Sequence, residues 1–177
     1  LYLGRSPPAK GFIVIGDAIH ALLARHPQLF FVIVGREMGG FQGAPAMNYL
    51  WEKAGKFRGR VLFLGDMHHD LLYPVMRNAR AVVIPSLVEN FPNVCLEAMA
   101  HRCVVIGTRG TAFEQLLVEG VSGLLCEPGS TAGLVEAVGK ALSLSEAERE
   151  NMGEKAEERI RALRPEIVVE QLLSFYS

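Results

Sequence analysis

The stretch Ala81-Val-Val-Ile-Pro-Ser-Leu-Val-Glu-Asn-Phe-Pro-Asn-Val-Cys-Leu-Glu97 holds a short apolar run, a polar turn and the start of a helix. Residues 81–84 are apolar at every position, which is typical of a parallel strand that is covered on both faces. Pro85 ends this run, and Asn93 is a candidate N-cap for a helix that reaches His101. The stretch therefore predicts one β–loop–α unit, with its polar loop at the carboxyl end of a buried strand.

The same alternation continues through all 177 residues, half of which are hydrophobic. Apolar runs of strand length alternate with amphipathic stretches of helical spacing. The expected strands are residues 1–3, 29–34, 61–64, 81–84, 104–106 and 123–126, and the expected helices lie near 12–26, 50–57, 69–78, 93–101, 131–142, 145–163 and 165–176. This order predicts one α/β domain, a doubly wound Rossmann-like parallel sheet of about six strands with helices on both faces and right-handed crossovers.

Local signals mark two helix starts and one loose connection. Thr131 can cap the helix that follows it, and Ser145 with Glu148 three residues later has the pattern of a capping box. The glycine-rich segment 35–45 has no regular pattern and is expected to be a mobile loop.

Composition excludes several classes of function. The 18 Lys and Arg residues against 19 Asp and Glu residues leave a net charge of −1, so no long-range field attracts nucleic acid or an anionic membrane. The cysteines, Cys95, Cys103 and Cys126, form no Cys-x-x-Cys pair, which argues against a zinc site or a disulfide framework and favours the cytoplasm. The apolar runs are too short to span a membrane, and no signal peptide is visible. A chain that opens on Leu-Tyr-Leu-Gly reads as a piece of a longer protein.

Ligands of doubly wound sheets bind beyond the carboxyl ends of the strands. The first loop at that edge carries Arg5 and Lys10 on either side of a turn that leads into a helix. Two cations beside a helix N-terminus could form a diphosphate pocket, because the free amides there add positive potential. The alternative is a pair of solvated surface charges. The loop is neither a Walker loop nor a Gly-x-Gly-x-x-Gly motif, so a P-loop nucleotidase or an ordinary dehydrogenase is poorly supported.

The fourth loop carries two acids, Glu89 and Glu97, eight positions apart. Carboxylates accept hydrogen bonds from sugar hydroxyls, and two at this separation could hold two different sugar rings. Glu97 near a helix N-terminus is favourable by about 0.3–1 kcal/mol without any ligand, whereas Glu89 in a loop has no such structural reason to be acidic. The amides of Asn93, Val94 and Cys95 follow Pro92 and are expected to face the same crevice.

Several motifs occur together and in order. They are Gly4-Arg5…Lys10-Gly11, Val34-Gly35, Phe63-Leu64-Gly65, Pro85-Ser86…Glu89-Asn-Phe-Pro-Asn…Glu97-Ala-Met-Ala100 and Glu119-Gly120-Val-Ser-Gly123. In this order the chain resembles, over essentially its whole length, the C-terminal, donor-binding domain of group 1 (family 4) retaining glycosyltransferases. These enzymes have the GT-B architecture, in which two Rossmann-like domains face each other across a cleft. Their C-terminal helix crosses back to the N-terminal domain, which gives residues 165–177 an expected partner outside the chain.

The resemblance implies a role for each candidate residue. Arg5 and Lys10 would hold the donor diphosphate and stabilise the leaving group, Glu89 would contact the donor sugar, and Glu97 would contact the ribose hydroxyls. Gly35 would permit close approach, and the loop at Met67 would lie against the base. The remaining expected contacts come from the segment that joins the two acids: Asn90, Phe91, Pro92, Asn93 and Val94.

The implied activity is transfer of a hexose from a nucleoside diphosphate sugar to an acceptor, with retention, no cofactor and no metal ion. The chain alone is expected to bind nucleotide but to transfer little sugar, because the resemblance puts the acceptor site in the N-terminal domain. Two alternatives remain: a non-catalytic nucleotide-binding subunit and a GT-B-like epimerase. The chain departs from the family pattern at His101-Arg102-Cys103 and at residues 111–115, which puts any sugar contact of the latter loop in doubt.

Overall fold

A computed structural model describes residues 1–4, 10–36, 45–90 and 92–176 of the chain. Its sheet has six parallel strands in the order β3-β2-β1-β4-β5-β6. The strands are β1 (Tyr2–Leu3), β2 (Phe31–Val34), β3 (Val61–Phe63), β4 (Val82–Val83), β5 (Val105–Thr108) and β6 (Leu124–Cys126). The predicted doubly wound parallel sheet is confirmed, with every strand inside or within two residues of its expected range.

Strand order reverses between β1 and β4, which lie side by side in the centre of the sheet. From β1 the chain moves outward through β2 to β3, and it then returns to β4 and moves the other way through β5 to β6. Such a reversal is the topological switch point at which open α/β sheets bind their ligands. The loops that follow β1 and β4 therefore flank the expected site.

Helices cover both faces of the sheet. They are α1 (Phe12–Arg25), α2 (Ala46–Ala54), α3 (His69–Asn78), α4 (Asn93–Ala100), α5 (Phe113–Leu116), α6 (Thr131–Ser143), α7 (Glu146–Arg161) and α8 (Pro165–Tyr176), with a 3-10 helix η2 at Gly55–Arg60. On one face α1 packs between α2 and α6 over an apolar core that includes Ile15, Leu22 and Leu134. On the other face α4 packs on α7 over a second core with Met76 and Met99. Apolar strand residues project into both cores, which explains why the strands read as continuous apolar runs.

Some helix boundaries differ from the prediction. Helix α2 begins at Ala46, directly after the proline that ends the glycine-rich segment, and it stops at Gly55, where a positive φ of 57° turns the chain into η2. Ser130, not Thr131, caps α6, because its side chain accepts a hydrogen bond from the amide of Gly133. The capping box of Ser145 and Glu148 is confirmed at the start of α7.

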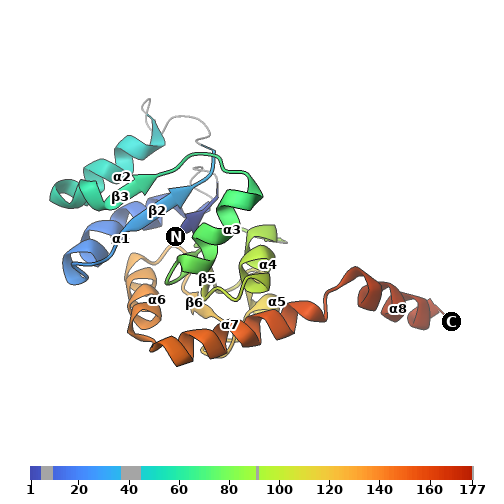
Figure 1. The fold of residues 1–177 in the computed structure, drawn as a ribbon. Coiled ribbons are helices and arrows are strands. Elements are labelled where there is room, and N and C mark those ends of the chain that lie inside the picture. Colours follow the sequence, from blue (N-terminus) through green and yellow to red (C-terminus); the bar gives the residue numbers. More distant parts are fainter. Residues whose placement is uncertain (5–9, 37–44, 91, 177) are drawn as a thin grey trace.

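Helix α8 projects away from the rest of the chain in Figure 1. Its described side chains include Val169, Leu173, Phe175 and Tyr176, all exposed. In the described part of the chain, every helix is too short or too polar to cross a membrane.

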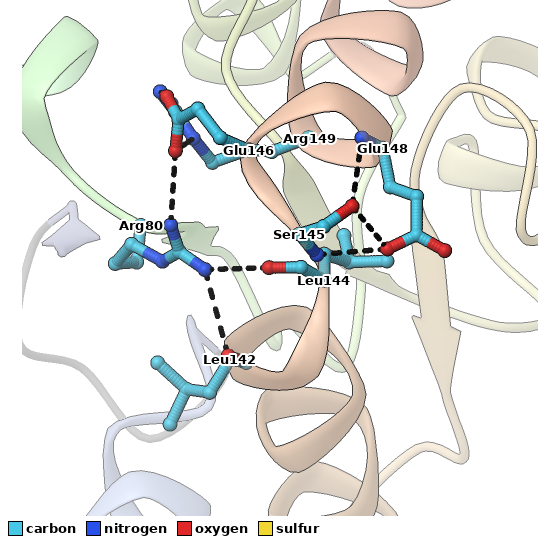
Figure 2. A network of polar contacts seen from close by, with 7 residues as sticks. All are labelled: Arg80, Leu142, Leu144, Ser145, Glu146, Glu148 and Arg149. Carbon is cyan, nitrogen blue, oxygen red and sulfur yellow. Dashed lines mark hydrogen bonds and ion pairs between the residues drawn. The ribbon is translucent and has the colours of Figure 1, made fainter.

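Arg80 ties the entrance of β4 to the corner between α6 and α7 (Figure 2). Its guanidinium donates to the carbonyl oxygen of Leu144 at 2.7 Å and contacts the carboxylate of Glu146 at 3.2 Å. Arg149 binds the same carboxylate, so two arginines share one acid at the start of α7. A cation at the end of α6 satisfies carbonyl groups that have no partner within the helix.

Replacing Arg80 by methionine keeps most of the apolar stem and removes the charged hydrogen bonds. We expect Arg80→Met to lower the free energy of unfolding by about 1–2 kcal/mol, measured by urea denaturation. Arg58→Met is the matched control, because Arg58 is exposed and its side chain has no ion pair among the described residues. Equal losses in the two variants would contradict the role of Arg80.

Candidate functional site

All carboxyl ends of the strands lie at one edge of the sheet, and the loops beyond β1, β2, β3 and β4 meet there. Two predicted site residues, Arg5 and Phe91, lie outside the described residues. The others belong to the described part of these loops and to the first turns of α4. Their positions can be compared directly with the expectations.

Glycines allow the first three loops to approach one another at main-chain distance. The amide of Gly35 donates to the carbonyl of Gly65 at 2.9 Å, and the amide of Gly4 donates to Val34 at 3.1 Å. A Cβ on Gly35 would lie 2.1 Å from the carbonyl oxygen of Gly4. Gly35 thus permits a close approach of the neighbouring loop, and its predicted approach to a ligand stays a prediction.

The loops after β1 and β4 are in direct contact across the switch point. Gly11 has a φ of 76°, and a Cβ there would lie 2.0 Å from the carbonyl oxygen of Pro85. Any side chain at position 11 would separate the two loops. Because position 11 has no side chain, Lys10 on the first loop lies next to the segment that carries Glu89.

Lys10 and Glu89 form an ion pair, with Nζ of Lys10 2.7 Å from Oε2 of Glu89. The side chains are 30% and 12% exposed, so the pair is partly shielded from water. The main-chain carbonyl of Glu89 accepts a hydrogen bond from the amide of Ala112 at 3.2 Å. Two residues that are 79 positions apart in sequence are therefore joined at the carboxyl edge of the sheet.

Helix α4 begins at Asn93, four residues after Glu89. Pro92 is the N-cap, because its carbonyl accepts hydrogen bonds from the amides of Cys95 and Leu96, so the prediction of Asn93 as N-cap is wrong. Asn93 is the first helical residue, and no side chain caps the helix. The first amides of such a helix have no acceptor within it and can bind an anion.

The carboxylate of Glu89 is close enough to α4 to act on its first turn. Cys95 in that turn is buried, and burial first and the charge of Glu89 second raise the pKa of its thiol to about 12. The thiol is therefore protonated at neutral pH and is a poor nucleophile.

Sequence reasoning gave no role to Ser86, which follows Pro85 at the end of the fourth strand. Its side chain is fully buried, and its Oγ has no hydrogen-bond partner among the described residues. A buried hydroxyl without a partner costs about 1–3 kcal/mol, so such a group in a native protein calls for an explanation. The available sequence signal was a small polar residue directly after the proline that ends the buried strand.

The second acid, Glu97, is half-buried in the second turn of α4. Burial first and Arg77 second lower the pKa of His101, and the charge of Glu97 opposes them. The carboxylate of Glu97 is therefore close enough to His101 to affect the pKa of its imidazole. No ion pair joins Glu97 to Lys10 among the residues that the structure describes.

The remaining predicted residues differ in exposure. Asn90 and Asn93 are exposed, Val94 and Gly35 are half-buried, and Pro92 is buried. Met67 packs against the second apolar core, and beside it Asp66 pairs with Arg36 across the second and third loops at 2.9 Å. The His, Cys, Asp and Glu side chains of the described residues form no group of three that could hold a metal ion.

A large cavity of the described structure lies at the opposite edge of the sheet. It has a volume of about 860 Å³ and is mostly apolar, with Phe31, Ala81 and Val138 in its lining. These residues lie at the amino ends of the strands or on α6. Because the predicted polar groups gather at the carboxyl edge, we assign the candidate site to the switch point and not to this cavity.

Comparison with known proteins gives consistent results. The family model described as glycosyl transferases group 1 matches residues 1–159. A phosphatidyl-myo-inositol mannosyltransferase of Mycolicibacterium smegmatis is 31% identical over 99% of this chain and 44% of its own length. Sucrose-phosphate synthase of Thermosynechococcus elongatus superimposes with a TM-score of 0.81 at 27% identity, over 99% of this chain and 44% of that one. The Anabaena protein HepE, solved in complex with UDP, superimposes with a TM-score of 0.80 at 23% identity, over 99% and 47% of the two chains.

The contact between Gly11 and Pro85 can be tested by adding a single methyl group. We expect Gly11→Ala to lower the free energy of unfolding by about 2 kcal/mol or more, because the left-handed backbone and the close carbonyl both oppose a Cβ. Urea denaturation measures the loss. Gly139→Ala is the control: position 139 lies within α6 with open space around it, so alanine should be neutral or stabilise by about 0.5–1 kcal/mol. A Gly11→Ala protein as stable as this control would refute the close contact.

Proposed function

Because this chain belongs to the group 1 glycosyltransferases, we propose that it is the donor-binding domain of an enzyme that transfers a hexose from a nucleoside diphosphate sugar. The observation that carries the proposal is the meeting of a cation, an acid and the N-terminus of α4 at the switch point of the sheet. A diphosphate needs positive groups and free amides, whereas a sugar needs hydrogen-bond acceptors. The loops at the switch point and the start of α4 supply both kinds of group.

In the proposed complex the diphosphate lies between the first loop and α4. Lys10 supplies a movable ammonium donor, Arg5 supplies a second cation, and the amides of Asn93 and Val94 supply main-chain donors. Ser86 is a further candidate donor, because its buried hydroxyl has no partner in the described part of the chain. The diphosphate gains negative charge as the glycosidic bond breaks, and fixed positive groups stabilise that change most effectively. We propose that they do so without a metal ion or other cofactor.

The sugar and the nucleoside occupy opposite ends of this site in the proposal. Glu89 accepts hydrogen bonds from the donor sugar, with Asn90, Phe91 and Pro92 beside it, and Glu97 accepts them from the ribose. The base lies near Met67 and Gly35, where the second and third loops approach each other. Complexes of HepE with UDP and with UDP-glucose support a nucleotide sugar as the ligand.

The chain spans less than half the length of the curated relatives named M. smegmatis phosphatidyl-myo-inositol mannosyltransferase and Corynebacterium glutamicum D-inositol 3-phosphate glycosyltransferase. We propose that the acceptor site lies in a second domain, that the exposed apolar side chains of α8 contact that domain, and that transfer retains the anomeric configuration. The chain by itself then binds nucleotide but transfers little or no sugar. A rate of sugar transfer by this chain equal to that of a two-domain protein would contradict the proposal that a second domain holds the acceptor site.

Calorimetric titration with UDP, GDP and ADP tests the donor site. We expect at least one of the three to bind, and we expect Lys10→Gln and Glu97→Gln each to weaken that binding by about 1.5–3 kcal/mol, because each removes a hydrogen bond to a charged group. Lys56→Gln and Glu52→Gln are matched controls, since both residues are exposed and belong to η2 and α2.

Comparing the site variants with the controls shows whether the nucleotide binds at the proposed site or elsewhere on the surface. Weakening by the site variants, with unchanged binding in the controls, supports the proposed complex. Unchanged binding in Lys10→Gln and Glu97→Gln would refute the site, and failure of all three nucleotides to bind would refute the donor-binding function.

A further inference from the structure

The pairing of Lys10 with Glu89 has a consequence for which ligand the site prefers. The proposed function gives the ammonium of Lys10 to the diphosphate and the carboxylate of Glu89 to the sugar, whereas in the structure these groups bind each other at 2.7 Å. We propose that Glu89 competes with the diphosphate for Lys10, so that the site favours the intact donor over the nucleoside diphosphate product. This inference rests on the proposed function.

The competition follows from charge and distance. A carboxylate 2.7 Å from Nζ neutralises much of the positive charge that would attract a phosphate oxygen. A diphosphate bound to the same Nζ would also bring its own negative charge close to Glu89. Because both side chains are partly shielded from water, this repulsion is screened less than at an open surface. The diphosphate must therefore displace the carboxylate of Glu89 from Lys10, or bind beside it and be repelled by its negative charge.

The main chain leaves little freedom for the two residues to separate. Gly11 is packed against Pro85, and the carbonyl of Glu89 is held by the amide of Ala112. The main chain at Gly11 and at Glu89 is thus held by neighbouring groups, so the ion pair opens by rotation of side chains. Lysine has a long flexible stem, which allows Nζ to turn toward a phosphate while the backbone stays in place.

The free energy needed to rotate Lys10 away from Glu89 depends on whether a sugar is bound. Sugar hydroxyls can donate hydrogen bonds to the oxygens of Glu89 and replace the bond from Lys10, so the intact donor leaves the acid satisfied. A nucleoside diphosphate without its sugar offers no such donors, and Glu89 then loses its side-chain partner when Lys10 turns away. Once the sugar has been transferred, the ion pair between Glu89 and Lys10 would form again and would lower the affinity for the nucleoside diphosphate product. Coupling of this kind is reciprocal, so freeing Lys10 must strengthen diphosphate binding.

The test is a double-mutant cycle on the 177-residue chain with UDP, GDP, ADP and inorganic pyrophosphate as probes in calorimetry. Glu89→Gln has nearly the same shape without the charge, and we expect it to bind the tightest nucleoside diphosphate about three- to tenfold more tightly than the unaltered chain. Lys10→Gln should bind it more weakly. The double variant should match Lys10→Gln, because the gain depends on the freed ammonium.

The outcomes distinguish this proposal from the proposed function. If the unaltered chain binds a nucleoside diphosphate but Glu89→Gln binds it no more tightly, the competition is refuted and the donor site stands. A gain that persists in the Lys10→Gln background would also refute it, since the effect would then be one of general charge. If no probe binds to either protein, the proposed function itself fails.

A second variant guards against misfolding. Glu89→Asp keeps the charge but withdraws the carboxylate by one methylene group, and it should give a smaller gain of the same sign if Glu89→Gln does not fold. Thermal unfolding identifies which variant is folded, and Glu52→Gln, an acid-to-amide change on α2, should leave binding of every probe unchanged. A loss of affinity in folded Glu89→Asp would overturn the proposal.

Discussion

The close contact between Gly11 and the carbonyl of Pro85 is the constraint on which the candidate site depends. Parallel strands bring all carboxyl ends to one edge of the sheet, but that alone leaves the loops after β1 and β4 free to diverge. Without a side chain at position 11 the two loops meet at van der Waals distance. Lys10 and Glu89 then lie within one hydrogen bond of each other, beside the N-terminus of α4.

The fold could be predicted because most strand residues are buried, so that the strands read as uninterrupted apolar runs, although Leu62 in the edge strand β3 is exposed. Residues 29–34 are an example: the structure narrows them to β2 (Phe31–Val34) without changing their role. Helix boundaries were less certain, because several residue types can cap a helix and only the backbone decides which one does. Ser130 and Thr131 are adjacent candidates, and Pro92 supplies the first carbonyl of α4 although Asn93 has the better capping side chain. The four-residue helix α5 has too few positions to show a period.

The candidate site was predictable as a set of residues but not as a set of contacts. Its location follows from topology, since the first and fourth loops flank the switch point in any sheet of this order. The ion pair of Lys10 and Glu89 depends on side-chain rotamers and on the approach of segments 79 positions apart, which no local pattern encodes. The burial of Ser86 depends in the same way on packing from several elements. In the proposed function, the site combines groups that attract a diphosphate with an acid that opposes it, and the bound sugar changes the balance between them.

A crystal structure of this chain with a bound nucleoside diphosphate tests the central claim most directly. The account predicts phosphate oxygens within hydrogen-bond distance of Nζ of Lys10 and of the first amides of α4, with Glu89 turned away from Lys10. A nucleotide bound in the apolar cavity at the amino edge of the sheet, with the pair of Lys10 and Glu89 intact, would contradict it.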